Sequence, residues 1–427
     1  MATTRRQFIK RSAGAVTVSL VMPNLWLTSA RAQEVQDVNR RILVVIGLYG
    51  GNDGLNTVVP YSDSRYQSLR PVLGFKDVDL KDSQGTSTII DSNFGLHPAL
   101  SELKAMYDAR KVAIVLGVSY PNPNLSHFLS QDIWQTANTS GGLGNGWLGK
   151  YADQKLVGQS GLSAISIGGS LPKAMFADKF VVPNISSFAN YTYQTDGRFQ
   201  GDRTNQINTF NTLNSRTFDA GSFTAYIGDT GMDAVSGAKQ VQDAVATYSS
   251  TVTYPAQNSL ASALKMVAQV ASTIPQANLF YVQLGGFDHH SQEIGSNADP
   301  TNKLIGQHFN LLKNVSQGVK AFYDDMAAHS LADKLVLMTW SEFGRRPNEN
   351  ASHGTDHGTT SPQFVIGDPV AGGLYGEQPS LSDLDSAGNM KVKVDFRSIY
   401  ATILDKWLGA DSQSILGAKY DDLGFLT

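Results

Sequence analysis

The sequence predicts an α/β fold with a doubly wound, mainly parallel sheet and helices on both faces. Short runs rich in aliphatic and β-branched residues recur along the chain with almost no polar positions, as strands covered on both faces require. Amphipathic helical patterns lie between these runs, and alternating strands and helices favour parallel pairing. Because 427 residues exceed the usual span of one small core, we expect one large domain with insertions or a core with a cap lobe.

The predicted strands are short apolar runs without period-two alternation. They are ILVVIGL (42–48), VAIVLGV (112–118), LSAISIGG (162–169), LFYVQLGG (279–286) and KLVLMTWS (334–341). The predicted helices show apolar positions three and four residues apart. They cover residues 97–110, 126–137, 259–272, 301–329 and 395–409.

One polar stretch interrupts this alternation. Residues 184 to about 257 are rich in Asn, Thr and Tyr, as in NYTYQTDGRFQGDRTNQ. Within a domain that spans 33–427, we expect this stretch to form an inserted cap or lid, or else a long surface excursion.

The N-terminus has the pattern of an export signal. Arg5-Arg6 precedes an apolar, small-residue run that ends in the sequence Ala-Arg-Ala at 30–32. This predicts a cleaved twin-arginine signal peptide over 1–32, contact with the twin-arginine translocase, and a periplasmic or secreted protein. The alternative is retention as a membrane anchor. Pro23-Asn24 interrupts a run already short for a bilayer span, so we expect no stable membrane span in the mature protein.

Composition excludes several classes of function. Cleavage after residue 32 would remove only basic charges, so the 34 lysines and arginines fall to 29 against 37 acids, a net charge near −8. Nucleic acid is therefore not an expected partner. The absence of cysteine excludes disulfides, thiolate metal sites and thiol nucleophiles. The motifs G-x-S-x-G and H-E-x-x-H are also absent, which removes the usual support for serine hydrolases and zincins.

Candidate functional side chains follow the predicted strands. Ligands of open α/β sheets bind beyond the carboxyl ends of the strands, so the residues just after each run are informative. These residues are Asp53 in YGGNDGLNT, Ser126 and His127 in GVSYPNPNLSHF, Asp288, His289 and His290 in FDHH, Glu342, Arg345 and Arg346 in SEFGRR, and His353, Asp356 and His357 in NENASHGTDHGTT. We expect them to converge on one edge of the sheet.

Each candidate also has a structural explanation when it is taken alone. Asp53 suits a turn, and Ser126 suits a helix N-cap. Glu342 and Arg345 suit a structural ion pair. Exposure to solvent would account for one of the two adjacent histidines. Their convergence at every strand end favours a functional site over these separate explanations.

A mixed set of Asp, Glu and His side chains suits a divalent cation. Zinc, manganese, magnesium and calcium are the candidates, and two ions a few ångströms apart can clamp both oxygens of a displacement reaction. A serine at a helix start fits the same chemistry, because a metal lowers its hydroxyl pKa and the free backbone N–H groups hold an anion.

A series of motifs resembles one protein family. They are the N-terminal signal, GGNDGLNTVVPY, LHPAL, SHF, GGFDHH, SEFGRR and GTDHG, in this order. Together they resemble the exported bacterial proteins grouped as domain of unknown function 1501, placed near sulfatases and the alkaline phosphatase superfamily. The resemblance covers essentially the whole mature chain and implies an alkaline-phosphatase-like fold.

The superfamily pattern implies roles for individual residues. Asp53 resembles the metal ligand after the first strand, and Ser126 resembles the nucleophile. One metal site would then be formed by Asp288, His290 and His357. A second would be formed by Asp53, Ser126 and Glu342.

The chain departs from the superfamily pattern in two places. Glu342-Phe343 stands where an Asp-His pair is usual, and the spacing from Asp288 to its histidine is shorter. Either a second metal is held differently, through His289, His353 or Asp356, or only one ion binds. Arg345 would then replace a metal's charge by gripping an anionic oxygen.

The function implied is an exported metal-dependent hydrolase of phosphate or sulfate esters. Its substrate would be an anionic small-molecule or polymer ester. The alternative is a non-catalytic periplasmic or secreted binding protein that keeps the fold with a vestigial or single-metal site. The missing Asp-His pair favours this alternative, whereas the presence of Ser126 and the strand-end acids favours catalysis.

Overall fold

The computed structural model describes residues 39–426, apart from 142–143, 193–194, 196–197, 217, 220–221, 297–298 and 300. The predicted signal peptide lies outside the described residues. Among the helices that are described, none has both the length and the apolar character needed to cross a bilayer.

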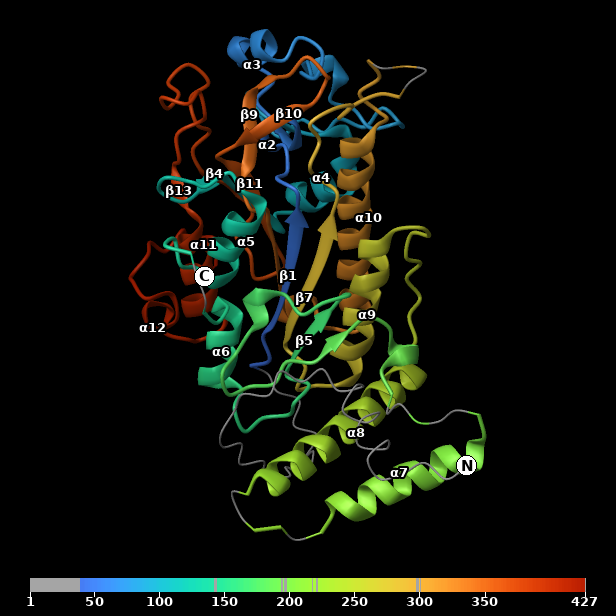
Figure 1. Ribbon diagram of the computed structural model, residues 1–427. Helices are drawn as coiled ribbons and strands as arrows, with labels where there is room; N and C mark the ends of the chain where they lie inside the picture. Colours follow the sequence, from blue (N-terminus) through green and yellow to red (C-terminus); the bar gives the residue numbers. More distant parts are fainter. Residues whose placement is uncertain are drawn as a thin grey trace.

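In this part of the chain, one mixed sheet of nine strands organises the molecule (Figure 1). Its strands are β1 (Ile42–Tyr49), β4 (Val112–Ser119), β5 (Ala164–Ile167), β6 (Asn184–Ile185), β7 (Leu279–Gly285), β8 (Leu335–Trp340), β11 (Ser361–Ile366), β12 (Gly373–Gly376) and β13 (Val394–Asp395). The strand order is β12-β4-β11-β8-β1-β7-β5-β6, and β13 also pairs with β4. All pairings are parallel except those of β11, which runs antiparallel to β4 and β8. The predicted mainly parallel α/β sheet is confirmed.

Two short antiparallel pairs of strands lie outside this sheet. β2 (Val58–Val59) pairs with β3 (Gly95–Leu96), and β9 (Gly344–Glu349) pairs with β10 (Thr355–Gly358). The β9–β10 hairpin, which carries the SEFGRR and GTDHG motifs together at the carboxyl edge of the sheet, was not predicted from the sequence.

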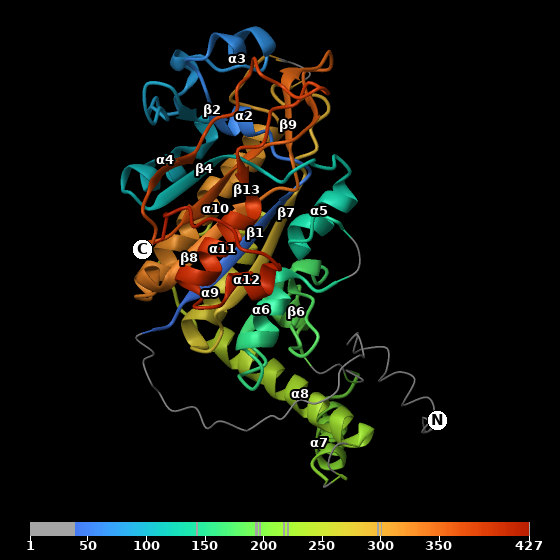
Figure 2. The same ribbon diagram turned by 90° about the vertical axis from the view of Figure 1, so that its left-hand side faces the viewer.

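Helices cover both faces of the sheet (Figure 2). One face is covered by α4 (Ser101–Asp108), α9 (Ser259–Thr273) and α10 (Gln307–Ala328). The other face is covered by α5 (His127–Thr136), α6 (Trp147–Lys155), α11 (Phe396–Thr402) and α12 (Ser412–Leu416). Short helical turns complete the chain: α2 (Gly54–Thr57), α3 (Ser64–Leu69), η1 (Asp77–Asp79), η2 (Pro98–Leu100), η3 (Lys173–Met175), η4 (Phe188–Asn190), η5 (Ala332–Lys334) and the π-helical η6 (Ile403–Trp407).

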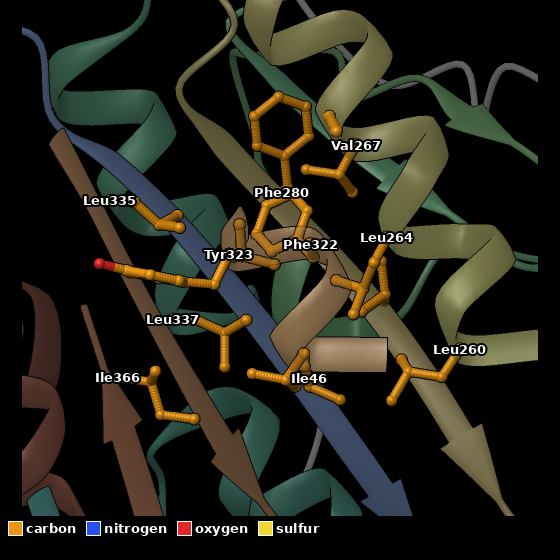
Figure 3. Packing of buried hydrophobic residues seen from close by; sticks show 14 of the residues in the cluster. Ile46, Leu260, Leu264, Val267, Phe280, Phe322, Tyr323, Leu335, Leu337 and Ile366 are labelled. Carbon is orange, nitrogen blue, oxygen red and sulfur yellow. The ribbon is translucent and has the colours of Figure 1, made fainter. Parts of the chain in front are cut away.

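The central strand β1 shows why its sequence is apolar throughout. Ile42, Val44 and Ile46 point into the core beneath α4, α9 and α10, whereas Leu43 and Val45 point into the core on the other face. Successive side chains of a strand alternate between faces, so burial of both faces removes the polar positions. Figure 3 shows the first of these cores, where side chains of the strands and of α9 and α10 pack together.

The predicted insertion forms an arm rather than a lid. Its first residues belong to the edge strand β6, and its helices are α7 (Gln200–Asn214) and α8 (Phe223–Thr247). Both views show these helices at the end of the molecule opposite the carboxyl ends of β1 and β7. Since the site described below lies at those carboxyl ends, the arm does not cover it.

Candidate metal centre

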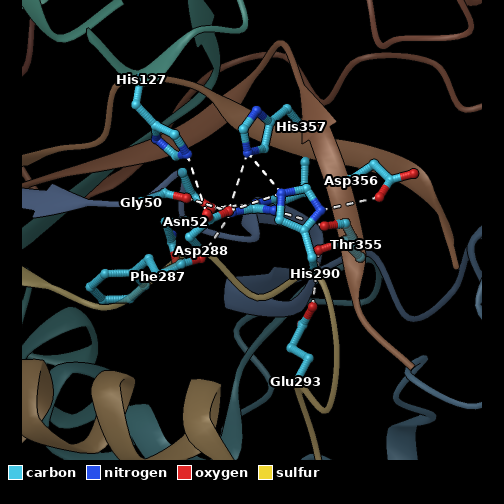
Figure 4. Close-up of polar contacts among 12 residues, drawn as sticks. Gly50, Asn52, His127, Phe287, Asp288, His290, Glu293, Thr355, Asp356 and His357 are labelled. Carbon is cyan, nitrogen blue, oxygen red and sulfur yellow. Dashed lines mark hydrogen bonds and ion pairs between the residues drawn. The ribbon is translucent and has the colours of Figure 1, made fainter. Parts of the chain in front are cut away.

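Three elements meet beyond the carboxyl ends of β1, β7 and β8. The loop after β7 carries Asp288 and His290, the first turn of α5 carries His127, and β10 carries His357. One ligand atom from each of His127, Asp288 and His357 lies within 4.8 Å of the other two. Figure 4 shows the imidazole rings of His127, His290 and His357 directed toward Asp288.

The Asp288 carboxylate is the centre of this group. Nε2 of His127 lies 3.4 Å from one oxygen, and Nε2 of His290 and of His357 lie 3.1 and 3.2 Å from the other. The Nε2 atoms of His290 and His357 are 3.0 Å apart. Three imidazoles and one carboxylate therefore approach a common region.

An oxygen behind each ring fixes its protonation. Nδ1 of His127 is 2.8 Å from Glu342 Oε1, Nδ1 of His357 is 2.8 Å from the Leu125 carbonyl, and Nδ1 of His290 is 3.2 Å from Asp356 Oδ1. A carbonyl or carboxylate oxygen only accepts, so each Nδ1 carries the proton and donates it. In the neutral rings, all three Nε2 atoms then present lone pairs to the centre of the group.

The three Nε2 lone pairs and the Asp288 carboxylate face one another and repel, so positive charge is needed between them. Protons can supply the charge, and so can a metal ion. Ligands at 2.0–2.1 Å from a tetrahedral ion stand about 3.3 Å apart, close to the separations of 3.0 to 3.4 Å seen between these ligand atoms. The residues therefore fit one divalent ion, and a set dominated by imidazole nitrogen suits zinc better than magnesium or calcium.

The electrostatics of the group also suit a cation. Partial burial would raise the pKa of Asp288, but the hydrogen bond and the charge of Arg345 outweigh it and lower the pKa to about 2. The hydrogen bond to Glu342 raises the pKa of His127, and burial lowers the pKa of His357. Asp288 is thus ionised at neutral pH, and a proton competes with a metal at His127.

Glu342, a predicted metal ligand, lies behind His127 and is not among the ligand atoms that converge on Asp288. It is fully buried, and its Oε1 accepts from Gly50 N at 2.9 Å, Gln131 Nε2 at 3.0 Å and His127 Nδ1. It orients His127, as carboxylates behind metal-binding histidines commonly do. The neighbouring Phe343 packs its ring against those of His127 and His357, with centroids 4.9 and 4.5 Å away.

Arg345 is not available to bind an anionic substrate, contrary to the prediction. Its side chain is buried, and its three nitrogens donate to protein oxygens. These acceptors are the carbonyls of Gly50, Gly51, Phe287 and Thr355 and the carboxylate of Asp288. Gly51 allows this close packing, because its φ is +78° and a Cβ there would lie 2.3 Å from the Phe343 ring. Arg345 instead fixes the loops that carry Asp288.

Asp53 is likewise engaged away from the ligand group. Both of its oxygens accept from the guanidinium of Arg70, and both side chains are buried. Burial would raise the pKa of Asp53, but the charge and hydrogen bonds of Arg70 outweigh it and lower the pKa. Burial, followed by the charge of Asp53, raises the pKa of the neighbouring Glu293. The predicted second metal site at Asp53 is therefore replaced by an internal ion pair.

Ser126 occupies the N-cap position of α5 without using its side chain for capping. Its backbone N–H donates to Asn124 Oδ1 at 2.8 Å, and its hydroxyl makes no cap hydrogen bond. The side chain is exposed and directly precedes His127. The hydroxyl is thus not used for capping and lies on the residue before His127.

The remaining predicted candidates separate into two groups. Asp356 contacts His290 and belongs to the edge of the site. His289 points elsewhere, buried near Phe287 and His308. His353 lies in the turn between β9 and β10, with a φ of +54°. Neither His289 nor His353 is among the ligand atoms that converge on Asp288.

Sequence reasoning noted His127 but did not assign it to the metal site. Its position after Ser126 at a helix start is the only local signal, since its partner Glu342 lies 215 residues away. It likewise missed Arg70, which lies outside every recognised motif and reveals its role only through its contact with Asp53.

The fold and this group of side chains define a mixed α/β protein with a candidate single-metal centre. The chain matches the family described as "Protein of unknown function (DUF1501)" over residues 116–423, and it belongs to that family. The family prediction is thereby confirmed. No curated protein sequence matches the chain.

A search of solved structures finds several that are similar to the chain. A protein in the alkaline phosphatase superfamily from Vibrio parahaemolyticus is 10% identical with a TM-score of 0.39, covering 99% of this chain and 79% of that one. The C-terminal periplasmic domain of EcEptC from Escherichia coli, in complex with Zn, is 12% identical with a TM-score of 0.40, covering 95% and 87%. The lipoteichoic acid synthase LtaP from Listeria monocytogenes is 10% identical with a TM-score of 0.39, covering 91% and 75%. The chemistry of the site rests on its own residues.

Proposed function

We propose that the protein is an exported, metal-dependent hydrolase of phosphate or sulfate esters. The observation that carries the proposal is the convergence of three imidazole Nε2 atoms on Asp288, each ring being fixed by an oxygen at its Nδ1. His127, Asp288 and His357 would hold one ion, with His290 beside them. When bound, such an ion supplies positive charge that stabilises negative charge developing on the ester oxygens.

Ser126 is the proposed nucleophile. Its exposed hydroxyl precedes His127, and the first backbone N–H groups of α5 lie at the same helix end, where they favour an anion. The serine oxygen would form a bond to phosphorus or sulfur while the bond to the alcohol oxygen breaks, and the serine proton would pass to the leaving oxygen. Water would then attack the same atom, the bond to the serine oxygen would break, and a proton from that water would restore the hydroxyl as phosphate or sulfate leaves.

Turnover tests this role directly. Hydrolysis of phosphate and sulfate monoesters is measured with zinc present for purified wild type, Ser126→Ala and Ser126→Gly. Both variants should bind zinc like wild type and lose orders of magnitude of rate. Near-normal turnover by Ser126→Gly would remove Ser126 from the mechanism.

Export is the second part of the proposal. It is supported by Arg5-Arg6 and the small-residue site at 30–32. Replacing both arginines with lysine should leave the unprocessed precursor in the cytoplasm, as measured by fractionation. Normal processing of that variant would contradict the assignment.

A non-catalytic metal-binding protein is the competing function. It is favoured by Arg345 and Asp53, whose charges are satisfied within the protein. Such a protein would bind zinc through the same residues but hydrolyse no ester in the panel.

A further inference from the structure

His290 differs from the other two imidazoles of the candidate metal centre in how its ring is held. The Nδ1 atoms of His127 and His357 face a buried carboxylate and a backbone carbonyl, whereas Nδ1 of His290 faces Asp356, whose side chain is 56% exposed (Figure 4). A carboxylate at the surface can turn into water, and holding it in one rotamer costs conformational entropy. Asp356 can therefore fix His290 only if another group fixes Asp356.

Asn350, which directly follows β9, makes that contact. Its Nδ2 donates to Asp356 Oδ1 at 3.2 Å, and the same oxygen lies 3.2 Å from His290 Nδ1. Nδ2 also donates to the backbone carbonyl of His290 at 2.9 Å. Asn350 thus reaches His290 twice, at the ring through Asp356 and at the backbone directly.

The contacts of the Asn350 amide select one orientation of that amide. Its Oδ1 accepts from the backbone N–H groups of Ser352 and Gly354 at 2.9 and 3.1 Å. Turning the amide over would direct its oxygen at two acceptors and its NH2 group at two donors. Four contacts therefore hold the amide in place between the β9–β10 turn and the loop after β7.

This series of contacts ends at the candidate metal centre. Because Nδ1 donates to Asp356, the neutral His290 ring presents its Nε2 lone pair, 3.1 Å from Asp288 Oδ1. Without a fixed acceptor at Nδ1, the neutral ring can carry its proton on either nitrogen. A proton on Nε2 would remove that lone pair from the centre.

We propose that Asn350 is a positioning residue, which holds the Asp356 carboxylate and through it selects the His290 tautomer whose lone pair faces the metal centre. The inference rests on the proposed function only for the use made of this lone pair, since the contacts themselves need no metal.

Nitrogen NMR of the metal-free protein, with isotope-labelled histidine, reads the tautomer directly. The measurement is made at about pH 8.5, where an unperturbed imidazole is neutral. Wild type should show His290, identified by the signal that is missing from His290→Gln, with its proton on Nδ1. Asn350→Ser should show a mixture of both tautomers. Serine can still accept from the backbone N–H two residues on, but it is too short to reach Asp356.

Asn138→Ser is the matched control. The Asn138 amide forms the same kind of turn just beyond the other end of α5, where it accepts from Ser140 N at 3.1 Å and donates to the Gly141 carbonyl at 3.3 Å. This variant should keep the single His290 tautomer. Asn350→Asp is a second test variant, because it keeps the turn but directs a carboxylate oxygen at Asp356. It should give the same mixture as Asn350→Ser.

Zinc affinity then separates this route from a general loss of structure. Asp356→Ala should weaken zinc binding by about 10- to 100-fold, as the loss of a partner behind a histidine at a metal commonly does. Asn350→Ser should weaken it by about 3- to 10-fold, the effect of about one hydrogen bond. The double variant should bind zinc no more weakly than Asp356→Ala, because Asn350 acts through Asp356.

The contrary outcomes are distinct. An unchanged His290 tautomer in both Asn350 variants overturns the inference and leaves the proposed function standing. A double variant weakened by the product of the two single effects also overturns it, because Asn350 would then act independently of Asp356. If wild type binds no zinc, the proposed function fails, while the tautomers still decide the role of Asn350.

Discussion

Nδ1 of His127 lies 2.8 Å from Oε1 of the buried Glu342, and this contact determines which nitrogen of the imidazole faces Asp288. The carboxylate accepts the Nδ1 proton, so the neutral ring directs its Nε2 lone pair toward the candidate metal position. Glu342 thus acts through His127 as a positioning residue.

Replacing Glu342 with Gln should weaken zinc binding by about 10- to 100-fold, because the ring loses the negative charge that fixes and polarises it. Affinity is measured by competition with a chelator of known zinc affinity. Glu349→Gln is the control, since Glu349 accepts from backbone N–H groups of Val72 and Leu73 outside the site. Equal affinities of the two variants would contradict the positioning role.

Replacing Arg70 with Met should destabilise the protein by about 3–5 kcal/mol, because Asp53 would remain buried without its partner. The double variant Asp53→Asn/Arg70→Met should recover part of that loss. Unfolding in denaturant measures both. Asp53→Asn alone should leave the zinc content unchanged, so loss of zinc from this variant would restore Asp53 as a metal ligand.

The free energy of unfolding of the metal-free protein should fall as pH is lowered below about 6.5. Burial lowers the pKa of His97 to about 3 and that of His308 well below its usual value. The unfolded chain therefore binds protons that the folded protein excludes, at a cost of about 1.4 kcal/mol per pH unit for each histidine.

His97→Asn tests this pH dependence, because Asn preserves an acceptor for the Ala99 N–H that His97 now caps. Between pH 6.5 and 4.5, the variant should lose less stability than wild type, by about 1.4 kcal/mol per pH unit. Denaturant titrations with a chelator present measure the two slopes. Identical slopes would show that His97 does not titrate on unfolding.

The fold was largely predictable because burial on both faces leaves a strong local signal. Each of the five apolar runs coincides with a strand to within a few residues, and β1 alternates its side chains between two cores. The antiparallel strand β11 and the β9–β10 hairpin were not predicted, because strand direction depends on distant partners rather than on local composition.

The site was predictable as a location but not as a set of contacts. Strand ends identified Asp288, His290 and His357, which the structure brings together. The partner of Asp53 could not be predicted, because Arg70 lies in no recognised motif. The partners of Arg345 could not be predicted either, because the backbone carbonyls of Gly50 and Gly51 leave no signal in the sequence. Asp53 and Arg345 were therefore predicted to bind ligands, although their charges are paired with other side chains of the protein.

Zinc binding by equilibrium dialysis tests the metal centre most directly. Wild type should retain about one zinc ion per chain, since the residues fit one tetrahedral site. The double variant His127→Ala/His357→Ala should retain none under the same conditions. His329→Ala should bind like wild type, because His329 contacts the Asp325 and Ser249 carbonyls away from the site. Wild type without zinc, or a double variant that binds zinc as well as His329→Ala does, would contradict the assignment of the metal centre.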